Sequence, residues 1–147
     1  MKLLKNACVV LAFAFLLSGQ FGCATTSSVL SSTQFSESAY KTDLEIKADA
    51  IALIDRAKNR APYPKVAADV DRLMAKVNQA ISAEQLRPKN APTVAQWMKI
   101  REQLTNLFAL WKKQGSCSPA FASDARTQVG GLFDILIKTE NDKRKQS

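Results

Sequence analysis

TVAQWMKIREQLTNLFALWKKQG, residues 93–115, carries the clearest structural signal in this chain of 147 residues. Its large apolar side chains recur every three or four positions, at Trp97, Ile100, Leu104, Leu107 and Trp111, with Phe108 widening the stripe. Side chains with this spacing share one face of an α-helix, and that face must be buried against other elements. The segment therefore predicts a core helix over about residues 94–113.

Both ends of this segment carry patterns that terminate helices. Thr93 and Gln96 match a capping box, in which the two side chains satisfy free backbone N–H groups of the first turn. Lys112, Lys113 and then Gly115 are typical of a C-terminus, where cations offset the helix dipole and glycine adopts a left-handed turn.

Three further segments show helical periodicity, over about residues 37–60, 64–87 and 119–141. Their stripes are Tyr40, Leu44, Ala48, Ile51 and Ile54; then Val66, Val70, Leu73, Val77 and Ile81, beside Met74; then Phe121, Ala125, Val129, Leu132 and Leu136, beside Phe133 and Ile137. Ser36 and Ser118 are the predicted N-caps of the first and last segments, because a hydroxyl accepts a free N–H of the first turn.

Four amphipathic segments separated by three breaks predict an all-α protein. All five prolines fall at the breaks, and no strand-like alternation competes with the helical pattern. Segments of this length joined by short breaks are typical of an antiparallel four-helix bundle, here over residues 37–145. A three-helix core with the first helix loosely docked is the structural alternative.

The start of the chain has the pattern of an export signal. Lys2 and Lys5 precede an unbroken apolar run from Ala7 to Leu17, and small residues follow. That order predicts a signal peptide over residues 1–22. The apolar run is too short to cross a bilayer, which needs about 20 residues in a helix.

Gly22-Cys23, which ends this pattern, resembles the processing site of bacterial membrane lipoproteins. Gln20 and Phe21 depart from that family, which usually has Leu and a small residue at these places. The resemblance implies that Cys23 is acylated, with palmitate among its fatty acids, and that membrane lipid is a partner. An ordinary signal-peptidase cut after Ala24 is the alternative, and it would leave a soluble periplasmic protein.

Residues 23–36 are mostly Ser and Thr, which predicts a flexible tether between the processing site and the bundle. The whole chain has a net charge of +8, and removing Lys2 and Lys5 leaves 19 basic and 13 acidic residues, a net charge of +6. One small domain on a tether follows from this length.

The composition argues against catalysis, a metal site or a cofactor. Histidine is absent, and with it the commonest general base and metal ligand. The acidic residues are spread along polar helix faces, so no paired carboxylates of the kind that glycosidases use stand out. Cys117 is left without a disulfide partner if Cys23 is acylated. A bystander thiol, an intermolecular disulfide, or a Cys23–Cys117 bond without acylation remain the options.

Basic residues gather where the predicted helices end, as expected for cations at the negative end of a helix dipole. No aromatic residues are interleaved among them, so we expect no nucleic-acid partner. In an up-and-down bundle, some of these clusters face the same side as the tether. They form a candidate membrane-surface contact: Arg87, Lys89, Lys143, Arg144 and Lys145.

Large aromatic side chains and a glycine pair form the second candidate site. Aromatic residues at helical spacing usually fill a bundle core, and Gly130-Gly131 usually marks a kink or a close helix approach. The functional interpretation is a shallow site for an amphipathic helix of another protein. Its candidate residues are Trp97, Phe108, Trp111, Gly130 and Gly131.

These observations predict a non-enzymatic, membrane-tethered helical protein in the periplasm of a Gram-negative bacterium, acting through an envelope protein partner. It is similar in size, tether and helical content to pilotins, small helical lipoproteins that grip a helix of an outer-membrane secretion component. No motif transfers pilotin binding residues to this chain. The alternative function is a periplasmic inhibitor or immunity protein against an envelope-active toxin.

Overall fold

The computed structural model describes residues 33–146, and helices make up most of this part of the chain. The four helices are α1 (Glu37–Lys58), α2 (Ala67–Gln85), α3 (Ala91–Gln114) and α4 (Pro119–Asp142). Two short 3₁₀ helices, η1 (Tyr63–Lys65) and η2 (Lys143–Gln146), precede α2 and follow α4. The prediction of an all-α four-helix bundle is confirmed. The predicted signal peptide, Cys23 and most of the predicted tether lie outside the described residues.

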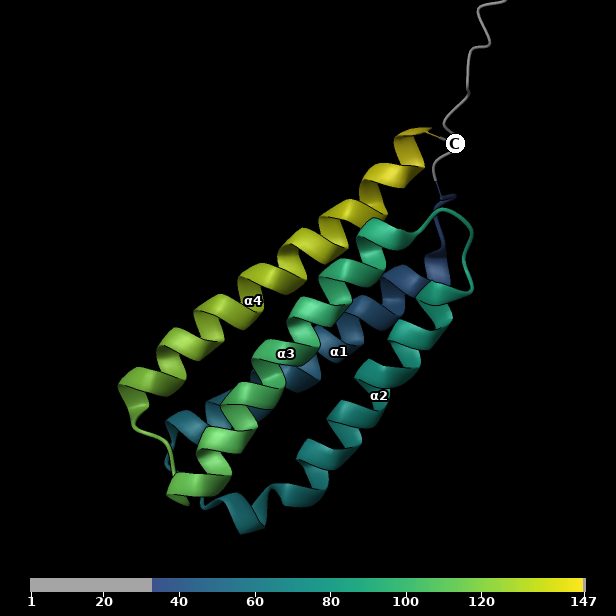
Figure 1. Cartoon of the computed structure of the whole chain (residues 1–147). Helices are drawn as coiled ribbons and strands as arrows, with labels where there is room; N and C mark the ends of the chain where they lie inside the picture. Colours follow the sequence, from purple (N-terminus) through teal and green to yellow (C-terminus); the bar gives the residue numbers. More distant parts are fainter. Residues whose placement is uncertain (1–32, 147) are drawn as a thin grey trace, which may run out of the picture.

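The helices run alternately up and down, and each packs against its two neighbours around the bundle (Figure 1). The most extensive contact joins α1 to α4, which excludes a loosely docked first helix. We call one end of the bundle the tether pole: it holds residues 33–36, the loop 86–90 and the end of α4. The opposite pole holds η1, the end of α3 and the start of α4 (Figure 1).

The core follows the predicted stripes of α2 and α3. All five predicted stripe residues of each helix are buried, and Trp97 and Trp111 are fully enclosed. Trp97 meets the ring of Phe133 edge-on, with 5.7 Å between centroids. The Trp111 indole N–H donates to the backbone oxygen of Ala61 at 3.0 Å. Large aromatics thus join α3 to α4 and to the α1–α2 connection.

The predicted core faces of α1 and α4 are partly wrong. Leu44 and Ala48 are exposed, whereas Asp43, Ile46, Ala50 and Leu53 of the same helix are buried. The residues of α1 that face the core are rotated from the predicted stripe, because α1 carries apolar residues on more than one face and its contact with α4 decides which of them are buried. Phe121 of α4 is likewise exposed, and its neighbour Ala122 is buried in its place.

The helix ends confirm three predicted signals and correct one. The hydroxyls of Ser36 and Ser118 accept N–H bonds from the first turns of α1 and α4, and Gly115 ends α3 with φ 76°. The predicted capping box is wrong, because α3 begins at Ala91, three residues before the predicted start at residue 94. Thr93 is therefore inside the helix, where its side chain is buried and bonded to another helix.

Candidate functional site

A groove of about 710 Å³ runs between α1 and α4. Leu44, Ala48 and Ile51 supply its apolar side chains from α1, and Gly130 and Gly131 face them from α4. Leu44 is 42 % exposed, so an apolar side chain is open to a partner there. The outward part of the predicted α1 stripe thus lines this groove instead of the core.

The glycine pair lies in the middle of α4, and the helix continues through it (Figure 1). A Cβ added at Gly130 would meet Ile51 Cδ1 at 3.8 Å, an ordinary contact, and one added at Gly131 would meet nothing within 4 Å. Each glycine costs a helix interior about 1 kcal/mol relative to alanine. The packing of α4 on α1 therefore does not require either glycine.

Two ion pairs bridge the helices on either side of the groove centre. Lys47 Nζ lies 2.5 Å from Asp134 Oδ1, and Arg126 Nε lies 3.0 Å from Asp55 Oδ1. The cation belongs to α1 in the first pair and to α4 in the second, so positive and negative charges occupy alternate corners of the groove. Exposed pairs of this kind contribute less than about 1 kcal/mol each, but they offer both signs of charge at each end.

The structure does not bring the predicted aromatic residues to the glycine pair. Trp97, Phe108 and Trp111 are buried in the core, so they fill the bundle and do not line an open site. Sequence reasoning missed Leu44 and Ile51 as groove residues. The available signal was the width of the apolar surface of α1, which carries more apolar residues than one core-facing stripe needs.

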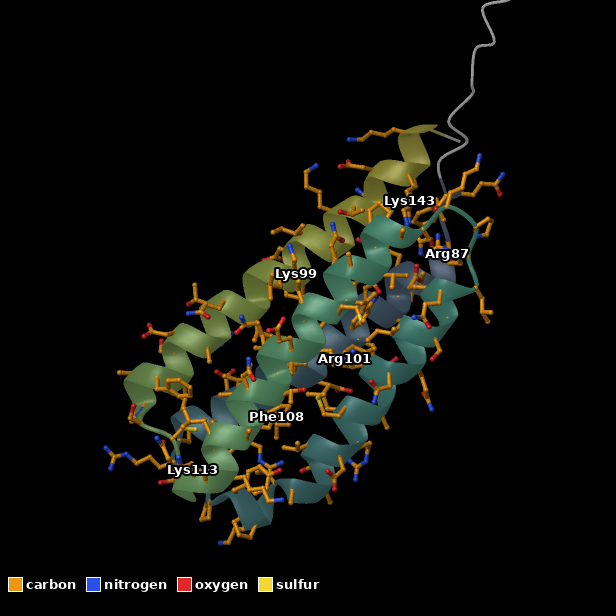
Figure 2. All side chains as sticks on the ribbon, viewed as in Figure 1. Arg87, Lys99, Arg101, Phe108, Lys113 and Lys143 are labelled. Atoms are coloured by element: carbon orange, nitrogen blue, oxygen red, sulfur yellow. The ribbon has the colours of Figure 1, made fainter. Side chains whose placement is uncertain are left out.

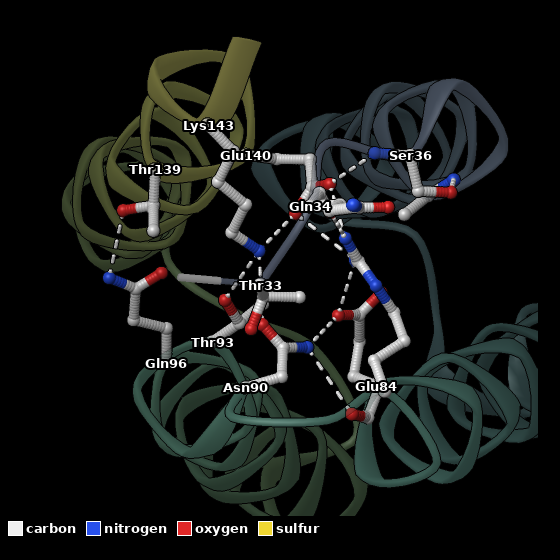
Figure 3. Close-up of polar contacts among 12 residues, drawn as sticks. Thr33, Gln34, Ser36, Glu84, Asn90, Thr93, Gln96, Thr139, Glu140 and Lys143 are labelled. Atoms are coloured by element: carbon white, nitrogen blue, oxygen red, sulfur yellow. Dashed lines mark hydrogen bonds and ion pairs between the residues drawn. The ribbon is translucent and has the colours of Figure 1, made fainter. Parts of the chain in front are cut away.

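A second constellation, a buried network of charged side chains, closes the tether pole (Figure 3). Glu84 at the end of α2 and Glu140 at the end of α4 are 4 % and 0 % exposed. Arg87 joins them, with Nη1 2.8 Å from Glu84 Oε2 and Nη2 2.7 Å from Glu140 Oε1. Burial acts against the charge of Arg87, but its bonds to Glu140 and Glu84 hold its pKa above the usual value.

Lys143 is the second cation of this network and is also buried. Its ammonium group contacts Glu140, and it donates to Asn90 Oδ1 at 3.0 Å and to Thr93 Oγ1 at 3.1 Å. Burial raises the pKa of Glu140, but its bonds with Arg87 and Lys143 outweigh that effect and lower it. Two carboxylates and two cations thus balance each other across three helices.

Asp43 of α1 is a third carboxyl group at this level and is 2 % exposed. Burial raises its pKa to about 7, with further contributions from Glu84 and Glu140, while Lys143 and Arg87 act in the opposite direction. A neutral Asp43 leaves the network balanced, whereas an ionised Asp43 adds an uncompensated buried charge.

The network also holds the chain that enters the bundle. Ser36 donates its N–H to Glu140 Oε1 at 2.8 Å, and Arg87 donates to the backbone oxygen of Gln34 at 2.6 Å. Thr33 is buried and donates its hydroxyl to the Pro88 oxygen at 2.8 Å. The last four residues of the predicted tether, 33–36, therefore lie fixed against the bundle.

Arg144 extends this attachment to the surface. Its guanidinium carbon lies 4.1 Å from the centre of the Phe35 ring, and its Nη2 lies 2.8 Å from Glu37 Oε2. The predicted membrane-contact cations thus divide into two groups. Arg87 and Lys143, labelled in Figure 2, serve the buried network at the tether pole, while Lys89 and Lys145 are exposed.

The remaining candidates offer little chemistry. Cys117 is free and 2 % exposed, and burial raises the pKa of its thiol, which favours the bystander interpretation. Within residues 33–146, no group of acidic or cysteine side chains is placed to hold a metal ion. Over the same part of the chain, every helix is too short or too polar to span a membrane.

Comparisons with known proteins add no relative: no protein-family model, no curated protein and no solved structure matches this chain.

Proposed function

We propose that this protein is an exported, lipid-anchored helical protein that acts by binding another protein of the bacterial envelope, in a pilotin-like accessory role. Its anchor is acylated Cys23, and its binding site is the α1/α4 groove. The glycine pair carries the proposal. Gly130 and Gly131 leave space for a Cβ that this chain itself does not fill, in a groove that the exposed side chain of Leu44 also lines. Glycine at such a place serves the close approach of another backbone.

The occupant that suits this groove is one amphipathic helix of the partner. The open floor lies between the ion pairs of Lys47 and Asp55, which are separated by about 12 Å along α1 at 1.5 Å per residue. A partner helix would therefore pack about two turns against Ala48, Ile51 and the glycine pair. A toxin inhibitor would use a basic end of the bundle to fit an acidic active-site cleft. This function has less support, because two cations of the tether pole, Arg87 and Lys143, are already paired inside the bundle.

Gly131→Leu tests the groove without threatening the fold. A Cβ added at this position meets no neighbouring atom within 4 Å, and leucine is a better helix former than glycine. The variant should therefore gain up to about 1 kcal/mol of stability while its side chain blocks the groove. Ala109→Leu on the exposed face of α3 adds the same side chain away from the groove and is the matched control.

The full chain, tagged at its C-terminus, would be crosslinked in native membranes and purified with each variant. We expect one envelope protein to be recovered with the wild type and with Ala109→Leu, and to be lost with Gly131→Leu. Recovery of the same partner with Gly131→Leu would exclude the groove. If only a second copy of this chain is recovered, the groove serves self-association and the proposal of an envelope partner is wrong.

The anchor has its own test. Cells supplied with a clickable palmitate analogue should label the wild type and leave Cys23→Ser unlabelled. A mature N-terminus at Thr25, found by mass spectrometry, would instead identify the cut after Ala24 and remove the anchor from the proposal.

A further inference from the structure

We infer that the tether pole is a lipid-contacting surface, in which Leu86 and the loop to Lys89 rest in the interfacial region of an anionic bilayer. This inference rests on the proposed lipid anchor at Cys23. It adds the residues that meet the membrane and the orientation in which the bundle stands on it.

Leu86 is the first observation. It caps the end of α2 and is 86 % exposed, more than Ile135, Leu44 or Met98. A single exposed leucine on a protein surface is ordinary, so its position decides its meaning. Leu86 begins the loop whose Pro88 oxygen accepts the hydroxyl of Thr33, and the chain toward Cys23 departs from this point.

The fixed segment 33–36 sets where the anchor can lie. Thr33 lies ten positions after Cys23, and a fully extended chain of that length spans at most about 35 Å. The 24 residues of α3 make the bundle about 36 Å long. Because the chain leaves beside Pro88 at the tether pole, an acylated Cys23 keeps this pole within about 35 Å of the membrane, whereas the opposite pole can lie a further bundle length away.

The surface beside Leu86 has the composition of a membrane interface. A shallow hollow of about 640 Å³ adjoins the loop, and its apolar lining is Ala91, Val94, Ala95 and the 41 % exposed Met98. Lys89 borders the hollow, and Lys145, which pairs with Asp142, is exposed on η2 at the same pole. Apolar groups bordered by cations are the pattern of interfacial binding to anionic lipid. The buried bonds of Arg87 and Lys143 hold this surface together.

Tryptophan fluorescence can locate this surface in the intact protein. The native Trp97 and Trp111 are fully buried, so they supply a constant background. Leu86→Trp and the control Ile135→Trp, on the exposed face of α4, would each be placed in the full chain. The proteins would be reconstituted into vesicles of phosphatidylethanolamine and phosphatidylglycerol that carry nitroxide-labelled lipids.

We expect strong quenching of Leu86→Trp and no quenching above the wild type for Ile135→Trp. In a vesicle flotation assay on chains that also carry Cys23→Ser, so that no acyl anchor holds them, Leu86→Ser should lower partitioning about tenfold and Lys89→Gln about fivefold, the latter only on anionic vesicles. Equal quenching at positions 86 and 135 would overturn the inference.

Palmitate labelling of the same preparations separates this result from the anchor. If the Leu86→Trp protein is labelled by palmitate but not quenched, the anchor is supported and the lipid-contacting surface is overturned. If it is quenched but not labelled, the anchor is overturned and the lipid-contacting surface is supported.

Discussion

The two poles of the bundle are closed by different interactions. At the opposite pole, Trp111 donates to the Ala61 oxygen, Tyr63 donates its backbone N–H to the Gly115 oxygen at 2.8 Å, and Cys117 is buried. At the tether pole, charged side chains of α2, α4 and η2 meet around Glu140. The opposite pole is therefore closed by apolar packing and backbone bonds, and we also call it the apolar pole. The tether pole is closed by buried ions, and we also call it the ionic pole.

This difference indicates what each pole supplies. Apolar packing adds stability that does not depend on pH. Buried ion pairs often add little net stability compared with apolar side chains, but they disfavour arrangements that leave a charge unpaired. At the tether pole, the favoured arrangement is also the one that attaches Gln34 and Ser36 to the bundle. The ionic pole thus sets the position of the entering chain.

Removing the central cation should have the largest effect. Arg87→Met leaves Glu84 and Glu140 buried with Lys143 as the remaining cation, and we expect a loss of about 3–5 kcal/mol in the free energy of unfolding, measured with urea at neutral pH. Arg72→Met removes an arginine from an exposed pair with Asp69 and should cost less than about 1 kcal/mol. Equal losses from the two variants would mean that the buried ion pairs of the ionic pole contribute no more to the free energy of unfolding than an exposed ion pair does.

Asp43→Asn should change the pH dependence of stability at the ionic pole. The folded protein holds a proton on Asp43 up to about pH 7, whereas the unfolded chain releases it near pH 3.8. The stabilising contribution of protonated Asp43 to the free energy of unfolding is therefore complete below pH 3.8. It falls between pH 3.8 and 7 and is absent above pH 7.

The full fall is on the order of 4 kcal/mol, from a shift of about three pKa units. The amide of the Asp43→Asn variant cannot ionise, so the variant should match the wild type near pH 4 and exceed it at pH 8 in urea unfolding. The loss of stability on acidification that arises from the lowered pKa of Glu140 should remain in both proteins. Parallel pH profiles from pH 4 to 8 would refute the titration of Asp43.

At the apolar pole, we expect the indole bond of Trp111 to matter more than the size of its ring. Trp111→Phe leaves the Ala61 oxygen without its donor, whereas the Trp97 indole N–H has no partner within the described part of the chain. Trp111→Phe should therefore cost about 1–3 kcal/mol more than Trp97→Phe. Chemical denaturation of both variants measures this difference, which should not change between pH 5 and 8.

The backbone of the apolar pole should show the smallest effects. Gly115 has φ 76° and Arg60 has φ 59°, a region that favours glycine. Gly115→Ala should lose about 1 kcal/mol, and Arg60→Gly should gain a smaller amount. Thermal unfolding of the two single variants tests the opposite signs. Losses in both would show that Arg60 contributes contacts that outweigh its backbone strain.

Local patterns predicted the helices better than they predicted the site. The buried stripes of α2 and α3 follow directly from their periodicity, because in each helix one face is apolar and the other polar. In α1, Leu44 and Ile46 are both apolar, so spacing alone could not decide which of them faces the core. Thr93 and Gln96 matched a cap at a position that the structure places inside α3.

The sequence contains a local signal for the buried network of the ionic pole, but the same residues also fit cations at exposed helix ends. Glu84 precedes Arg87 by three residues, and Glu140 precedes Lys143 by three, at the ends of two helices. These cations fit the expected preference for helix C-termini, so their burial did not follow from the sequence. The bond from Arg87 to Glu140 joins residues 53 positions apart.

The sequence alone determined that the chain forms four helices, where they begin and end to within a few residues, and which faces of α2 and α3 are buried. Periodicity, caps and prolines act over one or two turns, so they are visible in the order of residues. Only the tertiary structure decided the α1/α4 groove, the buried network and the attachment of residues 33–36. Each of these depends on how α1, α2 and α4 are rotated against one another, and that rotation is set by packing between residues distant in sequence.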